Sequence, residues 1–80
     1  MASFRNNTQI TDLIIHVDES IDHREEQLLL GEVRKMEGVM TPEFNRPHLM
    51  MVTYNPEKVN SYELLTTVRS EGYHAQLIGI

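Results

Sequence analysis

Two kinds of hydrophobic pattern divide the chain into short segments. Leu13, Ile15 and Val17 alternate with polar or mixed positions, which is typical of a strand with one buried face. Met50 and Val52 repeat this alternation later in the chain, where they are expected on a buried face. The segments expected as strands are residues 12–18, 39–45, 48–54 and 74–80. These segments predict a sheet with one face turned toward a hydrophobic core.

The first helix is predicted from spacing and from its first turn. Leu29, Val33 and Met36 recur at helical intervals and form one apolar stripe. Upstream of them, Asp22 and Glu25 have the spacing of a capping box, in which each side chain accepts a hydrogen bond from the other residue's amide. We therefore expect a helix that starts near Asp22.

Turn-forming residues indicate where the elements end. Gly38 is expected to end the first helix in a left-handed conformation. The second helix is expected to start near Asn60 or Ser61 and to end at Gly72. Residues 45–47, which read Asn-Arg-Pro, are expected to form the turn of a hairpin.

The resulting element order is βαββαβ. With right-handed crossovers, this order predicts an α+β, ferredoxin-like sandwich in which two helices cover one face of a four-stranded antiparallel sheet. Strand two is an edge strand in this topology, which agrees with Pro42, a residue that cannot donate to a ladder. We expect residues 12–80 to form a single domain after a flexible leader, residues 1–11.

Composition excludes several classes of function. The 80 residues contain no cysteine, which rules out thiolate metal sites, iron–sulfur clusters and thiol catalysis in this chain. The net charge of −5 and the scattered basic residues disfavour nucleic-acid binding. The apolar runs are too short to span a membrane, and residues 1–8 contain no apolar segment of a secretory signal. We therefore expect a cytoplasmic protein without nucleic-acid or membrane partners.

Several motifs resemble those of the heavy-metal-associated domain family, whose members include copper chaperones. Residues 51–59 read MVTYNPEKV, similar to the VTYDPEKV stretch of that family. Residues 62–65 and 71–75, which read YELL and EGYHA, resemble its EELI and AGYEA segments, and residues 37–39 resemble its PGV. The resemblance extends over residues 12–78 and implies the same ferredoxin-like fold.

The metal motif of that family is replaced in this chain. By the family's spacing, its two metal-binding cysteines fall on Asp22 and Glu25, and its Gly-Met pair falls on Glu19 and Ser20. Because Cu(I) prefers soft sulfur ligands, the two carboxylates are not expected to replace the cysteines as copper ligands. We therefore expect the thiolate chemistry of the family to be lost.

A harder metal site is an alternative at the same loop. Asp22, His23 and Glu25 carry oxygen and nitrogen ligands suited to Zn(II), Ni(II) or Mn(II). The resemblance places His74 in the facing loop, where it would complete the set. The competing interpretation is that Asp22 and Glu25 only cap the helix and that the histidines are solvated. On that interpretation the domain has no cofactor.

The uncovered face of the sheet is a candidate protein interface. The residues expected on it are Ile14, His16, Leu49 and Met51, with Ile78 and Ile80 as possible neighbours. Leu28 and Leu30 are expected to lie off the core stripe of the first helix. These positions favour a protein partner or a homodimer.

The chain lacks the motifs that mark common enzymes, including phosphate-binding glycine loops, nucleophile elbows and zinc-protease helices. We therefore expect no catalytic residues. The preferred function is a small binding or interaction domain that acts through protein contacts. The alternative is a metal-binding domain that uses the carboxylate and histidine side chains at the former metal loop.

Overall fold

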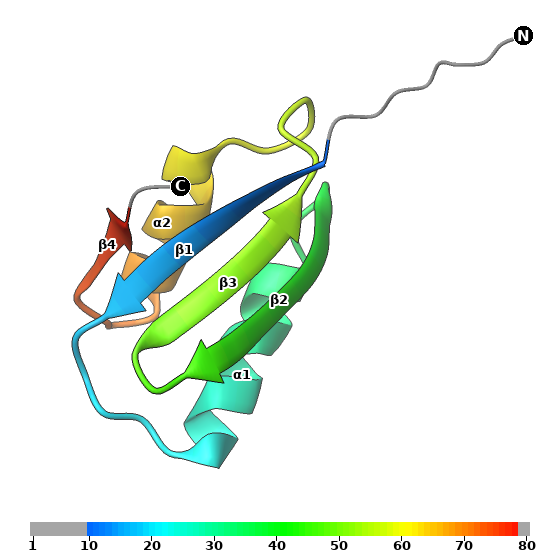
Figure 1. The fold of residues 1–80 in the computed structure, drawn as a ribbon. Coiled ribbons are helices and arrows are strands. Elements are labelled where there is room, and N and C mark those ends of the chain that lie inside the picture. Colours follow the sequence, from blue (N-terminus) through cyan, green and yellow to red (C-terminus); the bar gives the residue numbers. More distant parts are fainter. Residues whose placement is uncertain (1–9, 79–80) are drawn as a thin grey trace, which may run out of the picture.

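The computed structural model describes residues 10–78, and the chain follows the predicted element order (Figure 1). The elements are β1 (Thr11–Val17), α1 (His23–Arg34), β2 (Val39–Arg46), β3 (Leu49–Tyr54), α2 (Ser61–Ser70) and β4 (Ala75–Ile78). The βαββαβ order and the α+β class predicted from the sequence are confirmed.

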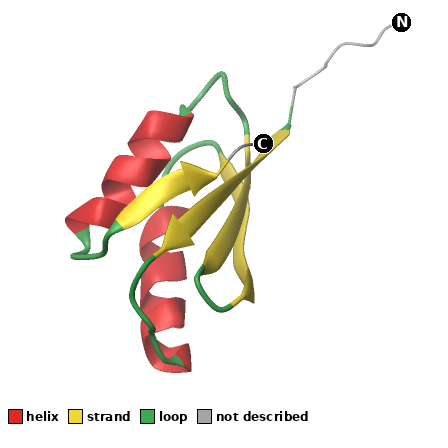
Figure 2. Ribbon diagram, turned by 60° about the vertical axis from the view of Figure 1, so that its left-hand side comes forward, coloured by secondary structure: helices red, strands yellow, loops and turns green. Residues whose placement is uncertain are grey.

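The four strands form one antiparallel sheet in the order β2-β3-β1-β4. Both helices lie on the same side of this sheet, as Figure 2 shows. No helix of residues 10–78 covers the opposite side, which is hereafter called the open face. The ferredoxin-like sandwich predicted from the sequence is therefore confirmed.

The core lies between the sheet and the helices. On β1 the side chains of Leu13, Ile15 and Val17 are buried, and the alternate positions on the other face are not. Met50 and Val52 of β3 are fully buried on the same side. Because every second residue of a strand faces one side, this alternation fixes which residues remain available on the open face.

The start of α1 agrees with the prediction, but its end does not. The helix ends at Arg34, whereas Gly38 was expected to end it. Gly38 instead adopts φ +97° in a turn that leads into β2, where a Cβ would lie 2.7 Å from the Cβ of Lys58. Leu30 was expected off the core stripe, but it is only 5% exposed. The buried face of α1 is wide enough to include the adjacent residues Leu29 and Leu30.

The hairpin between β2 and β3 is shifted from its predicted position. β2 continues through Arg46, so the turn consists of Pro47 and His48 rather than residues 45–47. His48 has φ +72°, the left-handed conformation that a type II turn requires at its second central residue. Pro42 lies in β2 at the edge of the sheet, as predicted, and its side chain is fully buried.

The boundaries of the first and last strands also differ by small amounts. β1 starts at Thr11 rather than at residue 12, and β4 starts at Ala75 rather than at residue 74. Residues 1–9, which make up most of the predicted leader, and Ile80 lie outside the described residues. Within residues 10–78, no helix is long and apolar enough to cross a membrane.

Candidate functional site

Three of the four predicted metal-ligand positions lie where the loop after β1 enters α1, and two of them cap this helix. The Asp22 carboxylate accepts a hydrogen bond from the Glu25 amide at 2.8 Å. The Glu25 carboxylate accepts one from the Asp22 amide at 3.2 Å, which completes the predicted capping box. Each carboxylate therefore satisfies a backbone amide that would otherwise lack a partner at the helix start.

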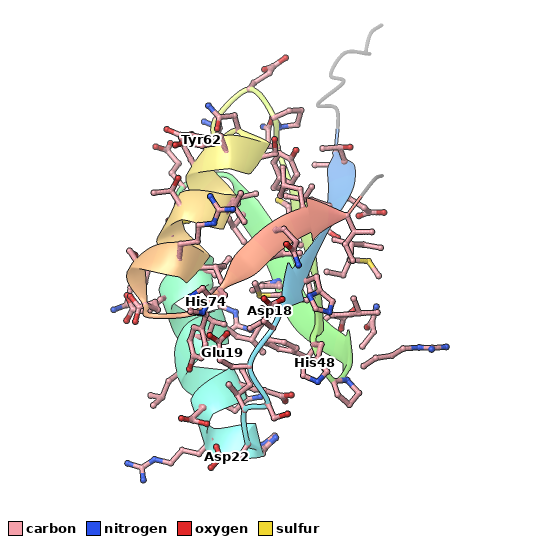
Figure 3. All side chains as sticks on the ribbon, turned by 90° about the vertical axis from the view of Figure 1, so that its left-hand side faces the viewer. Asp18, Glu19, Asp22, His48, Tyr62 and His74 are labelled. Carbon is pink, nitrogen blue, oxygen red and sulfur yellow. The ribbon has the colours of Figure 1, made fainter. Side chains whose placement is uncertain are left out.

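His74, which directly precedes β4, contacts a different carboxylate, that of Glu19 in the loop after β1. Nδ1 of His74 lies 2.6 Å from Oε2 of Glu19, and the His74 amide donates to both Glu19 oxygens at 3.0 and 3.1 Å. The hydrogen bond that His74 donates to the Glu19 carboxylate raises the pKa of His74, and the same bond lowers the pKa of Glu19. Figure 3 shows these two side chains close together below the start of β4.

Two further contacts join this end of the sheet. The Asp18 amide donates to the His74 carbonyl at 2.8 Å, and Arg69 Nε donates to the Ala75 carbonyl at 2.9 Å. Tyr73 is partly buried against the core, and this burial, followed by the charge of Glu25, raises the pKa of its hydroxyl. Hydrogen bonds within the chain therefore hold residues 74 and 75 in place at this end of the sheet.

The four predicted metal ligands do not converge. Asp22 and Glu25 lie together in the capping box, His23 is an exposed residue of the first helical turn, and His74 pairs with Glu19. Across residues 10–78, no group of three or more histidine, aspartate or glutamate side chains is arranged to hold a metal ion. Metal binding by these four residues stays a prediction.

The open face contains all four predicted interface residues. In the sheet, Ile14 on β1 pairs with Met51 on β3, and His16 pairs with Leu49. Residues that pair directly across antiparallel strands point to the same side, and these four side chains alternate with the buried ones. All four are partly exposed. Ile78 on β4 pairs with Ile14 and is 39% exposed.

A hollow of about 210 Å³ lies on this surface, over β1, β3 and the end of β2. Its lining consists of Ile14, Leu49 and Met51 together with Asn45 and Arg46 at the end of β2. Three of the five lining residues are therefore apolar, whereas the two on β2 are polar and include a cation.

Two histidines are neighbours of Leu49, which lines the hollow: His16 pairs with Leu49, and His48 precedes it in the chain. The rings of His16 and His48 are stacked, with centroids 5.8 Å apart and an interplanar angle of 16°. His48 is held by its Nδ1 atom, which lies 2.8 Å from the Val17 carbonyl, and Val17 donates its own amide to the His48 carbonyl. The sequence alone left open whether His48 would lie beside His16 or at the edge of the sheet, and the structure places it beside His16.

Comparison with known proteins gives matches in structure only. Neither protein-family models nor curated protein sequences match this chain. Among solved structures, the N-terminal domain of a potential copper-translocating P-type ATPase from Bacillus subtilis, solved in its Cu(I)-loaded state, superposes with a TM-score of 0.79. The alignment covers 86% of this chain and 88% of that domain at 20% identity.

Two further structures show the same likeness. A putative copper-ion-binding protein from Bacillus anthracis aligns over 88% of this chain and 100% of its own, with 15% identity and a TM-score of 0.79. Oxidised MerP from Ralstonia metallidurans aligns over 86% of this chain and 97% of its own, with 16% identity and a TM-score of 0.77. The chain has the heavy-metal-associated fold. The fold that the sequence motifs implied is thereby confirmed.

This heavy-metal-associated fold contains no cysteine, so a site built from thiolates is not available within it. The two positions that the motif comparison assigned to the cysteines carry the helix cap instead. Glu19 was not predicted as a partner of His74, because their contact joins residues 55 positions apart. Asn45 and Arg46 were not predicted at this surface, because the strand was expected to end at residue 45 and the turn was placed at residues 45–47.

Proposed function

We propose that this heavy-metal-associated fold is a non-enzymatic interaction domain that binds another protein through its open face. The observation that carries the proposal is the apolar hollow formed by Ile14, Leu49 and Met51 on the side of the sheet opposite the helices. A hydrophobic floor with a polar rim is the usual composition of a protein interface.

The loop between β1 and α1 supports this proposal because its carboxylates already accept hydrogen bonds from other groups of the chain. Asp22 and Glu25 use their carboxylates to cap α1, and Glu19 binds the imidazole and amide of His74. A divalent metal would have to compete with these hydrogen bonds for the carboxylate oxygens. Copper binding, which is named for several of the structural neighbours, is therefore not carried over to this chain.

A photo-crosslinking experiment tests the proposed surface. The amino acid p-benzoylphenylalanine replaces Met51 on the open face or, as the control, Tyr62, which is 68% exposed on α2. Figure 3 shows Tyr62 on the helical side of the molecule. Both variants are irradiated in the cells that express the chain, and the adducts are identified by mass spectrometry.

We expect one defined protein adduct from position 51 and not from position 62. The adduct should disappear when Leu49→Glu is added, because a charge in the hollow would remain desolvated at the interface. A failure of position 51 to yield any adduct beyond that of position 62 contradicts the proposal, provided that circular dichroism shows both variants to be folded.

A further inference from the structure

We propose that the partner bound by the open face is a second copy of this chain, arranged so that Glu43 of each subunit faces the partner's Arg46. This inference rests on the proposed function, because it uses the same surface. It adds the identity of the partner and the register in which two copies meet. The distribution of charges along the edge strand β2 sets this register.

Strand pairing places side chains of the open face in two rows across the sheet. The first row consists of Glu43, Met51, Ile14 and Ile78, from β2 to β4. The second row consists of Arg46, Leu49, His16 and Gln76. The β-bulge between Phe44 and Arg46 is what brings Arg46 to the same face as Glu43, because without it residues three apart would point to opposite sides.

These two rows are complementary to each other under a two-fold rotation. Two open faces can pack about a two-fold axis that lies in the interface, runs perpendicular to the strands and passes midway between the two rows. Row one of each subunit then lies over row two of the other. Glu43 then faces the partner's Arg46, and Met51 faces the partner's Leu49. Both contacts occur twice, because a two-fold interface repeats every pair. A second copy therefore supplies an opposite charge and an apolar side chain at matching positions.

Edge pairing through β2 is a less favourable way for two copies to associate. Pro42 lacks the amide hydrogen that an added strand would need, and β2 has two breaks in register, at residues 39–41 and 44–46. Both features are known to protect edge strands from pairing. Face-to-face packing leaves this edge unused and buries the hollow instead.

The size of the sheet limits the strength of such a dimer. Four strands about 4.8 Å apart and about six residues long cover roughly 400 Å² on each subunit. Stable complexes bury roughly 800 Å² on each partner, so we expect an equilibrium between monomer and dimer that shifts with concentration. The two charge pairs at the rim then determine the register more than the affinity.

Charge reversal at the two rim positions tests the register by sedimentation velocity over a dilution series. Glu43→Arg places an arginine opposite each partner's Arg46, and Arg46→Glu places a glutamate opposite each partner's Glu43. We expect each single variant to dimerise about tenfold more weakly than the unmodified chain, because two attractive pairs become repulsive. An equimolar mixture of the two variants should recover the dimer as a heterodimer, since all rim pairs are then opposite in charge.

The matched controls reverse exposed charges away from the open face, with Arg24→Glu on α1 and Glu57→Arg in the turn before α2. These controls should leave the monomer–dimer equilibrium unchanged and should not associate preferentially when mixed. A chain that stays monomeric at the highest concentration overturns the inference, as does a mixture that fails to recover the dimer. If the crosslinked adduct at position 51 is then a different protein, the proposed function stands and only self-association is excluded.

Discussion

The imidazole of His74 and the carboxylate of Glu19 connect two loops at one end of the sheet, with Nδ1 and Oε2 2.6 Å apart. This pair occupies the end of the fold where the sequence motifs had suggested a metal site. It raises the pKa of His74 above its ordinary value of 6.5 and lowers that of Glu19 below 4.5. Both shifts indicate that the ion pair forms when His74 is protonated and Glu19 is ionised.

We predict that this pair stabilises the domain most between about pH 4.5 and pH 6.5. The contribution of His74 is present below its ordinary pKa and is lost as the pH rises through its raised pKa. The contribution of Glu19 is present above its ordinary pKa and is lost as the pH falls through its lowered pKa. The difference in unfolding free energy between the unmodified chain and His74→Gln should therefore be largest in this window.

Urea denaturation over a pH series measures that difference, and NMR titration of the His74 ring gives its pKa directly. Glu19→Gln should lower the pKa of His74 without removing the imidazole. A stability difference that is the same at about pH 5.5 and about pH 9 would show that the contact is not an ion pair.

The capping box predicts a specific loss of stability in the absence of metal. Asp22→Ala removes the acceptor for the Glu25 amide and should reduce the unfolding free energy by about 1 kcal/mol. Asp22→Asn keeps an acceptor oxygen and should remain close to the unmodified chain. Both values are measured by urea denaturation with a chelator present. Equal stability of Asp22→Ala and the unmodified chain would contradict the capping role.

Metal titration separates the interaction domain from the alternative with a carboxylate and histidine site. Because Asp22 and Glu25 already accept backbone hydrogen bonds, we expect no stoichiometric, high-affinity uptake of Zn(II) in calorimetry. Cu(I) should also fail to bind tightly, since the chain offers no thiolate. Tight Zn(II) binding that Asp22→Ala with Glu25→Ala abolishes would instead establish the metal site.

Two glycines should respond to alanine in opposite directions. A Cβ at Gly31 in α1 meets no atom within 4 Å, so Gly31→Ala should stabilise the domain by up to about 1 kcal/mol. At Gly38, φ is +97° and a Cβ would lie 2.7 Å from the Cβ of Lys58, so Gly38→Ala should destabilise the domain by more than about 1 kcal/mol. Thermal or urea denaturation of the two variants tests both signs, and a similar effect at the two positions would contradict this prediction.

Local patterns were sufficient to predict the element order and most of the core. The alternation of Leu13, Ile15 and Val17 identified the buried face of β1, and the Asp22–Glu25 spacing identified the cap of α1. Both signals act over a few residues, within one strand or one helical turn. The position of the hairpin turn was predicted less well, because His48 adopts a positive φ without being a glycine.

Contacts between distant segments were not visible in the sequence. The pairing of Glu19 with His74 depends on two loops that meet only after β4 joins the sheet beside β1. The place of Arg46 on the open face depends on a β-bulge, which inserts a residue and leaves no clear mark in the pattern of apolar and polar positions. The open-face interface predicted from the sequence therefore lacked Arg46.

The sequence by itself determined the secondary structure, the faces of β1 and β3, and the absence of thiolate ligands, because these follow from residue type and short-range periodicity. Only the tertiary structure decided that Arg46 joins the open face, how the charges of that face line up, and which carboxylate His74 binds. The physical reason is that strand register and loop contacts bring together residues that are far apart in the chain, and no local pattern specifies those distances.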